Sequence, residues 1–334
     1  METITDAQLY EIYEFAVQLG KDAGAKLMTF ASARFTGPKG GDHAIEEKES
    51  SVDIVTKADR DMENYIYSAI RERYPTHKFL GEETYSAGAS RDYLIDDAPT
   101  WIIDPIDGTV NFTHLFPMFC LSIGFAIGGK PVIGVINAPF MSQMFSSCKG
   151  HGAWFNETQQ LPLMRNPIPP MPAAAPKGCI FSCEWGKDRK YRDDGNMKAK
   201  VDSFINMAAE MGSRDGKGGM VHGIRSLGSA TLDLAYTAMG SFDIWWEGGC
   251  WEWDVAAGIA ILQEAGGLIT TANPPATGDI DAAEIVEAKL GSRLYLAIRP
   301  AGPSETESGR QSQERVVREV WKRVHTLDYS RPGL

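Results

Sequence analysis

The stretch Trp101-Ile102-Ile103-Asp104-Pro105-Ile106-Asp107-Gly108-Thr109 decides the fold and the chemistry expected of this chain. Its apolar start predicts a buried strand, and Pro105 is expected to end that strand because proline cannot donate to a ladder. Asp104 and Asp107 then lie on the turn that leaves the sheet. Two carboxylates this close repel each other unless a cation lies between them. Hard oxygen ligands suit Mg²⁺, and Gly108 lets the backbone approach an anion. The stretch therefore predicts a metal-assisted phosphate site.

Composition narrows the class of protein. The chain has 334 residues, 43% of them hydrophobic, and a net charge of −11. That length fits one large domain or two closely packed halves. The negative charge argues against a nucleic-acid-binding face, although bound divalent cations can reverse the sign of an acidic pocket. No signal peptide and no apolar stretch of membrane-spanning length is visible, so membrane association is not expected. Five scattered cysteines favour a reducing cytoplasm over a disulfide framework.

The order of helical and strand patterns suggests stacked α and β layers. Helical spacing is found at 9–30, 59–74, 198–211 and 229–239, and again from Asp254 onward. Strands are expected at 78–80, 121–127, 132–136, 144–148, 243–246 and 294–298. Near the C-terminus, 302–311 is predicted to be a polar linker and 313–325 an amphipathic helix.

Three further carboxylates lie at element boundaries. Glu82 and Glu83 are expected where a strand meets a loop, and Asp254 where an apolar helix starts. Taken singly, the glutamates fit a solvated turn and Asp254 fits a helix cap, a position that aspartate favours. Taken together with Asp104 and Asp107, they suggest a pocket with several hard ligands.

These residues resemble the signature motifs of the inositol monophosphatase family. Three motifs carry the resemblance: Gly81-Glu82-Glu83; Asp104 to Thr109 followed by Asn111-Phe112; and Trp253-Asp254-Val255-Ala256-Ala257-Gly258. They occur in the family's order and at about its spacing. The likeness extends to Val52–Thr56 and His222–Gly228 and covers roughly Leu9 to Ile298. The middle motif is shared by the wider lithium-sensitive, Mg-dependent phosphatase superfamily, whereas Gly223–Gly228 points to the inositol monophosphatase branch.

The resemblance implies an α/β fold, the layered αβαβα sandwich of the sugar-phosphatase kind, and a homodimer. It implies a single phosphatase domain over 1–334. Within it, 1–160 would be the N-terminal metal-binding half, 175–300 the C-terminal substrate half, and 301–334 a C-terminal extension.

The implied activity is Mg²⁺-dependent hydrolysis of myo-inositol monophosphate to inositol and phosphate by metal-activated water. Two or three Mg²⁺ ions would bind per subunit. Carried over by motif, the metal ligands would be Glu82, Glu83, Asp104, the Ile106 carbonyl, Asp107 and Asp254. Asp104 would be shared by the first two metals, and Glu83 would support a weaker third position through water. Li⁺ is implied as an inhibitor that replaces Mg²⁺.

Catalytic and substrate-binding roles follow from the same motifs. The catalytic residues would be Thr109, Asp59 and Glu82, with Thr109 hydrogen bonded to Asp59 so that it orients the water on the first metal. The backbone N–H groups of Gly108 and Thr109 would hold the phosphate. The substrate ring would face Ala230, Glu247 and Trp251.

Two alternatives stay open. Trp251 stands where animal relatives place a histidine near the substrate, and a bulky indole there favours a different ring or leaving group. The substrate would then be another small sugar phosphate or a nucleotide 3′-phosphate. The second alternative is a catalytically silent regulatory homologue of the fungal quinate pathway. The presence of every expected metal ligand favours catalysis.

Overall fold

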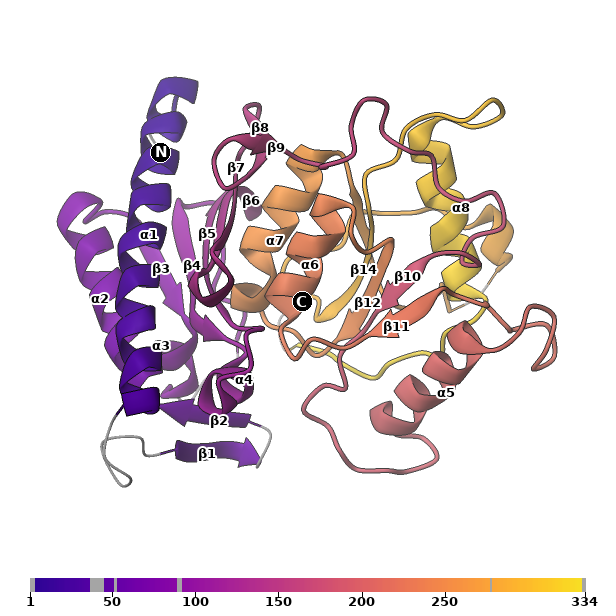
Figure 1. Cartoon of the computed structure of the whole chain (residues 1–334), viewed down its shortest axis with the longest axis horizontal. Helices are drawn as coiled ribbons and strands as arrows, with labels where there is room; N and C mark the ends of the chain where they lie inside the picture. Colours follow the sequence, from indigo (N-terminus) through magenta and orange to yellow (C-terminus); the bar gives the residue numbers. More distant parts are fainter. Residues whose placement is uncertain (1–3, 37–44, 51–52, 89–91, 277, 332–334) are drawn as a thin grey trace.

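The computed structural model describes residues 4–36, 45–50, 53–88, 92–276 and 278–331, which form alternating layers of helix and sheet (Figure 1). Helices α1 and α2 cover one face of a seven-stranded sheet, and α6 and α7 cover its other face. A five-stranded sheet lies beyond α6 and α7, with α5 and α8 on its far side. The predicted αβαβα sandwich is therefore confirmed.

The first two layers come from the N-terminal part of the chain. Their helices are α1 (Asp6–Thr36), α2 (Lys57–Arg73), α3 (Glu82–Ser86), α4 (Thr109–His114) and η1 (Pro139–Met141). The sheet strands, in spatial order, are β3 (Lys78–Gly81), β4 (Thr100–Asp107), β5 (Cys120–Ile127), β6 (Lys130–Ala138), β7 (Gln143–Cys148), β8 (Gly152–Phe155) and β9 (Gln159–Gln160). Strand β3 is parallel to β4 and the remaining pairs are antiparallel. A separate antiparallel ribbon joins β1 (Ile45–Ser50) to β2 (Asp53–Thr56).

The remaining layers come from the C-terminal part. Their helices are α5 (Asn196–Ala208), α6 (Ala230–Met239), α7 (Glu252–Ala265), η2 (Ile280–Ala282) and α8 (Gly309–Trp321). The five strands, in spatial order, are β11 (Gly223–Arg225), β10 (Ile180–Ser182), β12 (Ile244–Gly248), β14 (Leu294–Ile298) and β13 (Leu268–Thr270). The division into halves stays a prediction, and α7 contacts strands of both sheets. Among the described residues, no helix combines the length and apolar character that a bilayer crossing requires.

Strand β4 is buried on both faces of its sheet. Trp101 and Ile103 pack in the core beneath α1 and α2, whereas Ile102 packs in the core that contains α7. A strand covered on both sides must be apolar at consecutive positions, which explains the unbroken Trp-Ile-Ile run. The strand continues to Asp107, so the expected stop at Pro105 is wrong. Pro105 lies where the pairing with β5 changes register, a position that tolerates a missing donor.

Close packing fixes helix α7 against the first sheet. A side-chain carbon built on Gly134 of β6 would lie 2.2 Å from the carbonyl oxygen of Ala257. Only glycine at this position lets the helix backbone approach the strand so closely. The body of α7 is buried almost throughout. Because buried interiors resist displacement, the first turn of α7 is held at a defined height above the end of β4.

The C-terminal helix begins earlier than the sequence suggests. Helix α8 starts at Gly309 and ends at Trp321, whereas 313–325 was expected. Ser308 and Gln311 form a reciprocal capping box, which satisfies two backbone donors and starts the helix inside the predicted linker. Val316, Val320 and neighbouring side chains then pack against the second sheet.

Candidate active site

Three aspartate side chains meet where β4 ends and α7 begins. One carboxylate oxygen from each of Asp104, Asp107 and Asp254 lies within 4.8 Å of the other two. Asp104 and Asp107 belong to β4, and Asp254 lies in the first turn of α7. The structure thus brings together three of the predicted metal ligands from two elements about 150 residues apart in the sequence.

An irregularity in β4 lets its two aspartates converge. Residues three apart on a regular strand point to opposite faces of the sheet. Asp104 pairs with Ser122 and Asp107 with Cys120, so β4 uses one more residue than β5 over this interval. An extra residue of this kind reverses the alternation and turns both side chains toward the same site.

The pKa values of all three aspartates are raised, so their charged forms are disfavoured. Burial raises the pKa of Asp104 well above its ordinary range, and the charges of Glu82, Asp107 and Asp254 raise it further. Burial also raises the pKa of Asp107 from 3.8 to about 6, although a hydrogen bond from Ser229 opposes this shift. The pKa of Asp254 rises through burial and through the charges of Asp107 and Glu82. An all-oxygen cluster that resists ionisation on its own is matched to a hard divalent cation such as Mg²⁺.

Residues at the start of helix α6 hold the cluster through hydrogen bonds. Ser229, its N-cap, donates its hydroxyl to Asp107 and accepts a hydrogen bond from the Leu232 N–H at 3.2 Å. The Thr231 N–H also donates to Asp107, at 3.3 Å, and the Thr231 hydroxyl donates to the Asp254 carbonyl at 2.8 Å. The sequence motifs did not single out Ser229 or Thr231. Their position at a predicted helix start, where serine is favoured as a cap, was the available signal.

The residues predicted to orient water lie together beside the cluster. The Thr109 hydroxyl lies 3.2 Å from Asp59 Oδ1 and 3.0 Å from the Ile106 carbonyl oxygen, and it can donate to either. Asp59 is buried in the first turn of α2. Gly108 has φ +81°, and a side chain there would collide with the Met118 carbonyl at 2.7 Å. Glycine is therefore required at the bend that starts α4.

Glu82 and Glu83 open the short helix α3 and do not lie on a loop. Glu82 is outside the group of three aspartates, yet its charge contributes to the raised pKa of each of them. The helix is held by Glu63, which accepts hydrogen bonds from the N–H groups of Glu83 at 2.7 Å and Thr84 at 2.8 Å. Glu63 was not predicted. It follows Asp59 by four residues on α2, so the two acidic side chains share one helix face.

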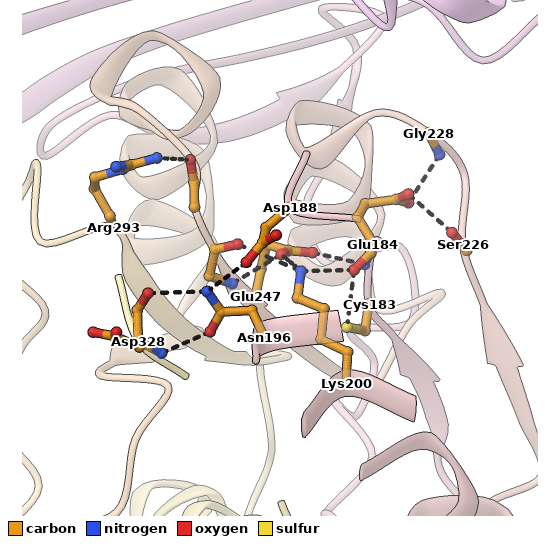
Figure 2. A network of polar contacts seen from close by, with 12 residues as sticks. Cys183, Glu184, Asp188, Asn196, Lys200, Ser226, Gly228, Glu247, Arg293 and Asp328 are labelled. Carbon is orange, nitrogen blue, oxygen red and sulfur yellow. Dashed lines mark hydrogen bonds and ion pairs between the residues drawn. The ribbon is translucent and has the colours of Figure 1, made fainter. Parts of the chain in front are cut away.

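Glu247 is buried and belongs to a network of polar contacts (Figure 2). Its carboxylate forms an ion pair with Lys200 and accepts hydrogen bonds from the N–H groups of Glu184 at 2.6 Å and Gly248 at 2.8 Å. The Lys200 side chain is 0% exposed and the Glu247 side chain 2% exposed. The predicted contact between Glu247 and substrate hydroxyls stays a prediction, and this buried pair disfavours it. Lys200 was missed because it lies on a helix that carries none of the motifs, 47 residues before Glu247.

Ala230 and Trp251, the other predicted substrate contacts, lie at helix starts beside the cluster. Ala230 is the first residue of α6 and is 9% exposed. Trp251 is the N-cap of α7, and its N–H donates to Asp254 Oδ2 at 2.7 Å. The Trp251 ring stacks on Trp253 with the centroids 5.6 Å apart, and the Arg293 guanidinium lies 3.9 Å from its centre. Helix α7 begins at Glu252, two residues before the expected start. Asp254 is thus not the N-cap itself but accepts the N–H of the N-cap residue from within the first turn.

Comparisons with known proteins establish the family. Residues 8–325 match the profile of the inositol monophosphatase family. The chain is 65% identical to "Quinic acid degradation cluster protein x" of Neurospora crassa, over 99% of this chain and 98% of that protein. It is 38% identical to inositol monophosphatase 2 of Saccharomyces cerevisiae, over 84% and 86% of the two chains. The solved inositol monophosphatase of Anabaena is 27% identical, with a TM-score of 0.65 over 96% and 98% of the two chains. The chain belongs to the inositol monophosphatase family, as its motifs predicted.

The raised carboxylate pKa values predict opposite pH dependences with and without Mg²⁺. Because the folded-state pKa of Asp107, about 6, exceeds its ordinary 3.8, metal-free stability should fall as pH rises from about 4 through 6. Mg²⁺ requires the charged carboxylates, so the rise in melting temperature on adding Mg²⁺ should be small near pH 5 and larger near pH 7.5. Thermal unfolding with EDTA, with Mg²⁺ and with K⁺ at matched ionic strength measures both effects. A Mg²⁺ effect that is largest near pH 5 would contradict the prediction.

The Lys200–Glu247 pair predicts a large loss of stability when only one partner is removed. Lys200→Met leaves a buried carboxylate unpaired and should lower the free energy of unfolding by about 3–5 kcal/mol. The double change Lys200→Met with Glu247→Gln should cost less than Lys200→Met alone, because no charge then stays buried. Urea unfolding measures both. Lys130→Met, which removes an exposed partner of Glu287, is the control and should have little effect.

Proposed function

We propose that this protein is a Mg²⁺-dependent phosphomonoesterase that hydrolyses myo-inositol monophosphate, acting as a homodimer. The observation that carries the proposal is the cluster of Asp104, Asp107 and Asp254, whose oxygens lie within 4.8 Å of one another beside the Thr109–Asp59 pair. Membership of the inositol monophosphatase family supports the same chemistry.

Different residues of the chain would bind the metal, orient the water and bind the phosphate. Asp104, Asp107 and Asp254, with Glu82, Glu83 and the Ile106 carbonyl, would hold the metal. Bound Mg²⁺ would act as a Lewis acid that makes water a nucleophile and stabilises the leaving oxygen. The Thr109 hydroxyl, directed by Asp59, would orient the attacking water. Gly108 and Thr109 would present backbone N–H groups to the phosphate at the start of α4. Ser229 and Thr231 fix the Asp107 carboxylate through hydrogen bonds.

Asp104→Asn should abolish most of the activity without unfolding the chain. The amide keeps the oxygen that accepts from the Ile106 N–H at 3.0 Å, but it loses the charge that a metal requires. We expect phosphate release to fall by about 100-fold or more, while the EDTA-treated protein melts at the same or a higher temperature because one repelling charge is gone. Asp96→Asn, an exposed aspartate paired with Lys78, is the matched control. Full turnover in Asp104→Asn would refute the ligand role.

The enclosure of Glu247 favours a second candidate substrate. The Glu247 carboxylate is buried in an ion pair with Lys200, so it is not available to bind the hydroxyl groups of a polyol substrate. The Neurospora crassa relative is named for quinic acid degradation, not for inositol phosphate. Quinic acid is a carboxylated cyclic polyol. A phosphate ester of such a ring would suit the same metal chemistry with different ring contacts. A regulatory protein without catalysis, the other alternative, would release no phosphate.

A substrate panel decides between these functions. We expect phosphate release from myo-inositol 1-phosphate, with kcat/KM higher than for glucose 1-phosphate, adenosine 3′-phosphate or a phosphorylated cyclic hydroxy acid, and inhibition by Li⁺. A preference for the hydroxy acid would replace the inositol assignment. No release from any ester at saturating Mg²⁺, combined with measurable Mg²⁺ binding, would support the regulatory alternative.

A further inference from the structure

The chain beyond α8 returns to the active site along a fixed path. The side-chain amide of Asn273 pairs with the backbone of Leu327, accepting from its N–H at 2.9 Å and donating to its carbonyl at 2.8 Å. Asn196 does the same for Asp328, at 2.7 Å and 3.0 Å (Figure 2). Two reciprocal pairs of this kind satisfy the backbone as a strand neighbour would. The segment 327–331 is therefore held in place by residues of the C-terminal layers.

This segment lies on the connection between β12 and α7. A side-chain carbon on Gly248 would come within 2.7 Å of Leu327 and 2.8 Å of Tyr329, and one on Gly249 within 2.9 Å of Tyr329. The two glycines thus leave room for Leu327 and Tyr329 to cross directly above them. The connection underneath leads from β12 to the first turn of α7, which carries Asp254.

The segment ends at a buried ion pair beside the metal cluster. Arg331 binds both carboxylate oxygens of Glu252, and both side chains are 0% exposed. The same guanidinium donates to the Tyr85 hydroxyl at 3.0 Å and the Asp92 carbonyl at 2.8 Å. It also lies 4.9 Å from the centre of the Trp251 ring. One guanidinium therefore contacts both α7 and α3.

These two helices carry proposed metal ligands from distant parts of the sequence. Glu252 precedes Asp254 by two residues on α7, and Tyr85 follows Glu82 by three on α3. Helix α3 has only five residues, so its position depends on contacts that it makes elsewhere. We propose that Arg331 is a positioning residue for the metal site, because it holds the start of α7 at a fixed distance from α3. The proposal rests on the Mg²⁺ site of the proposed function and adds the C-terminal segment to it.

Mg²⁺ affinity distinguishes positioning from simple stabilisation of the fold. Arg331→Gln should weaken Mg²⁺ binding by about tenfold, the size of effect seen when groups that orient metal ligands are removed. Arg331→Lys should recover only part of the loss, because an ammonium keeps the charge without the two-pronged contact. Arg315→Gln is the matched control. Arg315 binds Glu307 at 2.8 and 2.9 Å from helix α8, and its loss should lower the melting temperature without changing Mg²⁺ affinity.

Titration calorimetry with Mg²⁺ on the full-length variants, with the melting temperature in EDTA measured alongside, provides the test. Wild-type Mg²⁺ affinity in Arg331→Gln would overturn the proposal, whatever the activity. If that variant does not fold, Tyr85→Phe removes only the hydroxyl contact to α3 and should still weaken Mg²⁺ binding about threefold; unchanged affinity there would overturn it equally. Wild-type protein that binds Mg²⁺ but hydrolyses no ester would contradict the proposed function alone, since the affinity ratio between variant and wild type still decides the role of Arg331.

Discussion

Mutual repulsion among buried carboxylates is the constraint on which this structure depends. Asp104, Asp107 and Asp254 are brought within 4.8 Å of one another, with Glu82 near enough to raise the pKa of all three. Such a group would move apart if its supports were soft. Instead, β4 lies inside a seven-stranded sheet and α7 between two sheets, so the packing of both elements resists separation.

The three aspartates are thus held by separate elements of the layered fold. Strand β4 supplies two aspartates through an irregular register, α7 supplies the third, and α6 fixes Asp107 through Ser229 and Thr231. Short elements near the cluster are held by buried polar contacts. Helix α3, for example, has Glu63 at its N-terminal N–H groups. Long-range packing sets the position of each supporting element, and hydrogen bonds set the orientation of each of the three aspartates.

Local patterns predicted the three aspartates that the structure brings together, because each lies in a compact motif. The apolar run before Asp104 indicated a buried strand, and the apolar helix after Asp254 indicated near-complete burial; both elements are buried in the structure. The continuation of β4 past Pro105 was not predictable, because it depends on the register with β5. Nor were the partners of Glu247 and Glu252. Lys200 and Arg331 lie 47 and 79 residues away, and an isolated basic residue carries no signal of the acid it will meet.

The residues predicted to contact the substrate are held differently from the three aspartates. A carboxylate has about four acceptor positions, and Glu247 already receives Lys200 and two backbone N–H groups in a nearly dry setting. Because the Glu247 side chain is only 2% exposed, a ring hydroxyl could reach the carboxylate only if the residues that cover it moved. Trp251 is fixed instead of free, since Trp253, Arg293 and Arg331 all contact its ring. In the proposed function, a rigid indole beside Asp254 would select the substrate ring by shape more than by hydrogen bonding. In the proposed function, ring discrimination would therefore rest on Trp251 and on the Arg331 side chain that contacts it, and not on the Glu247 carboxylate.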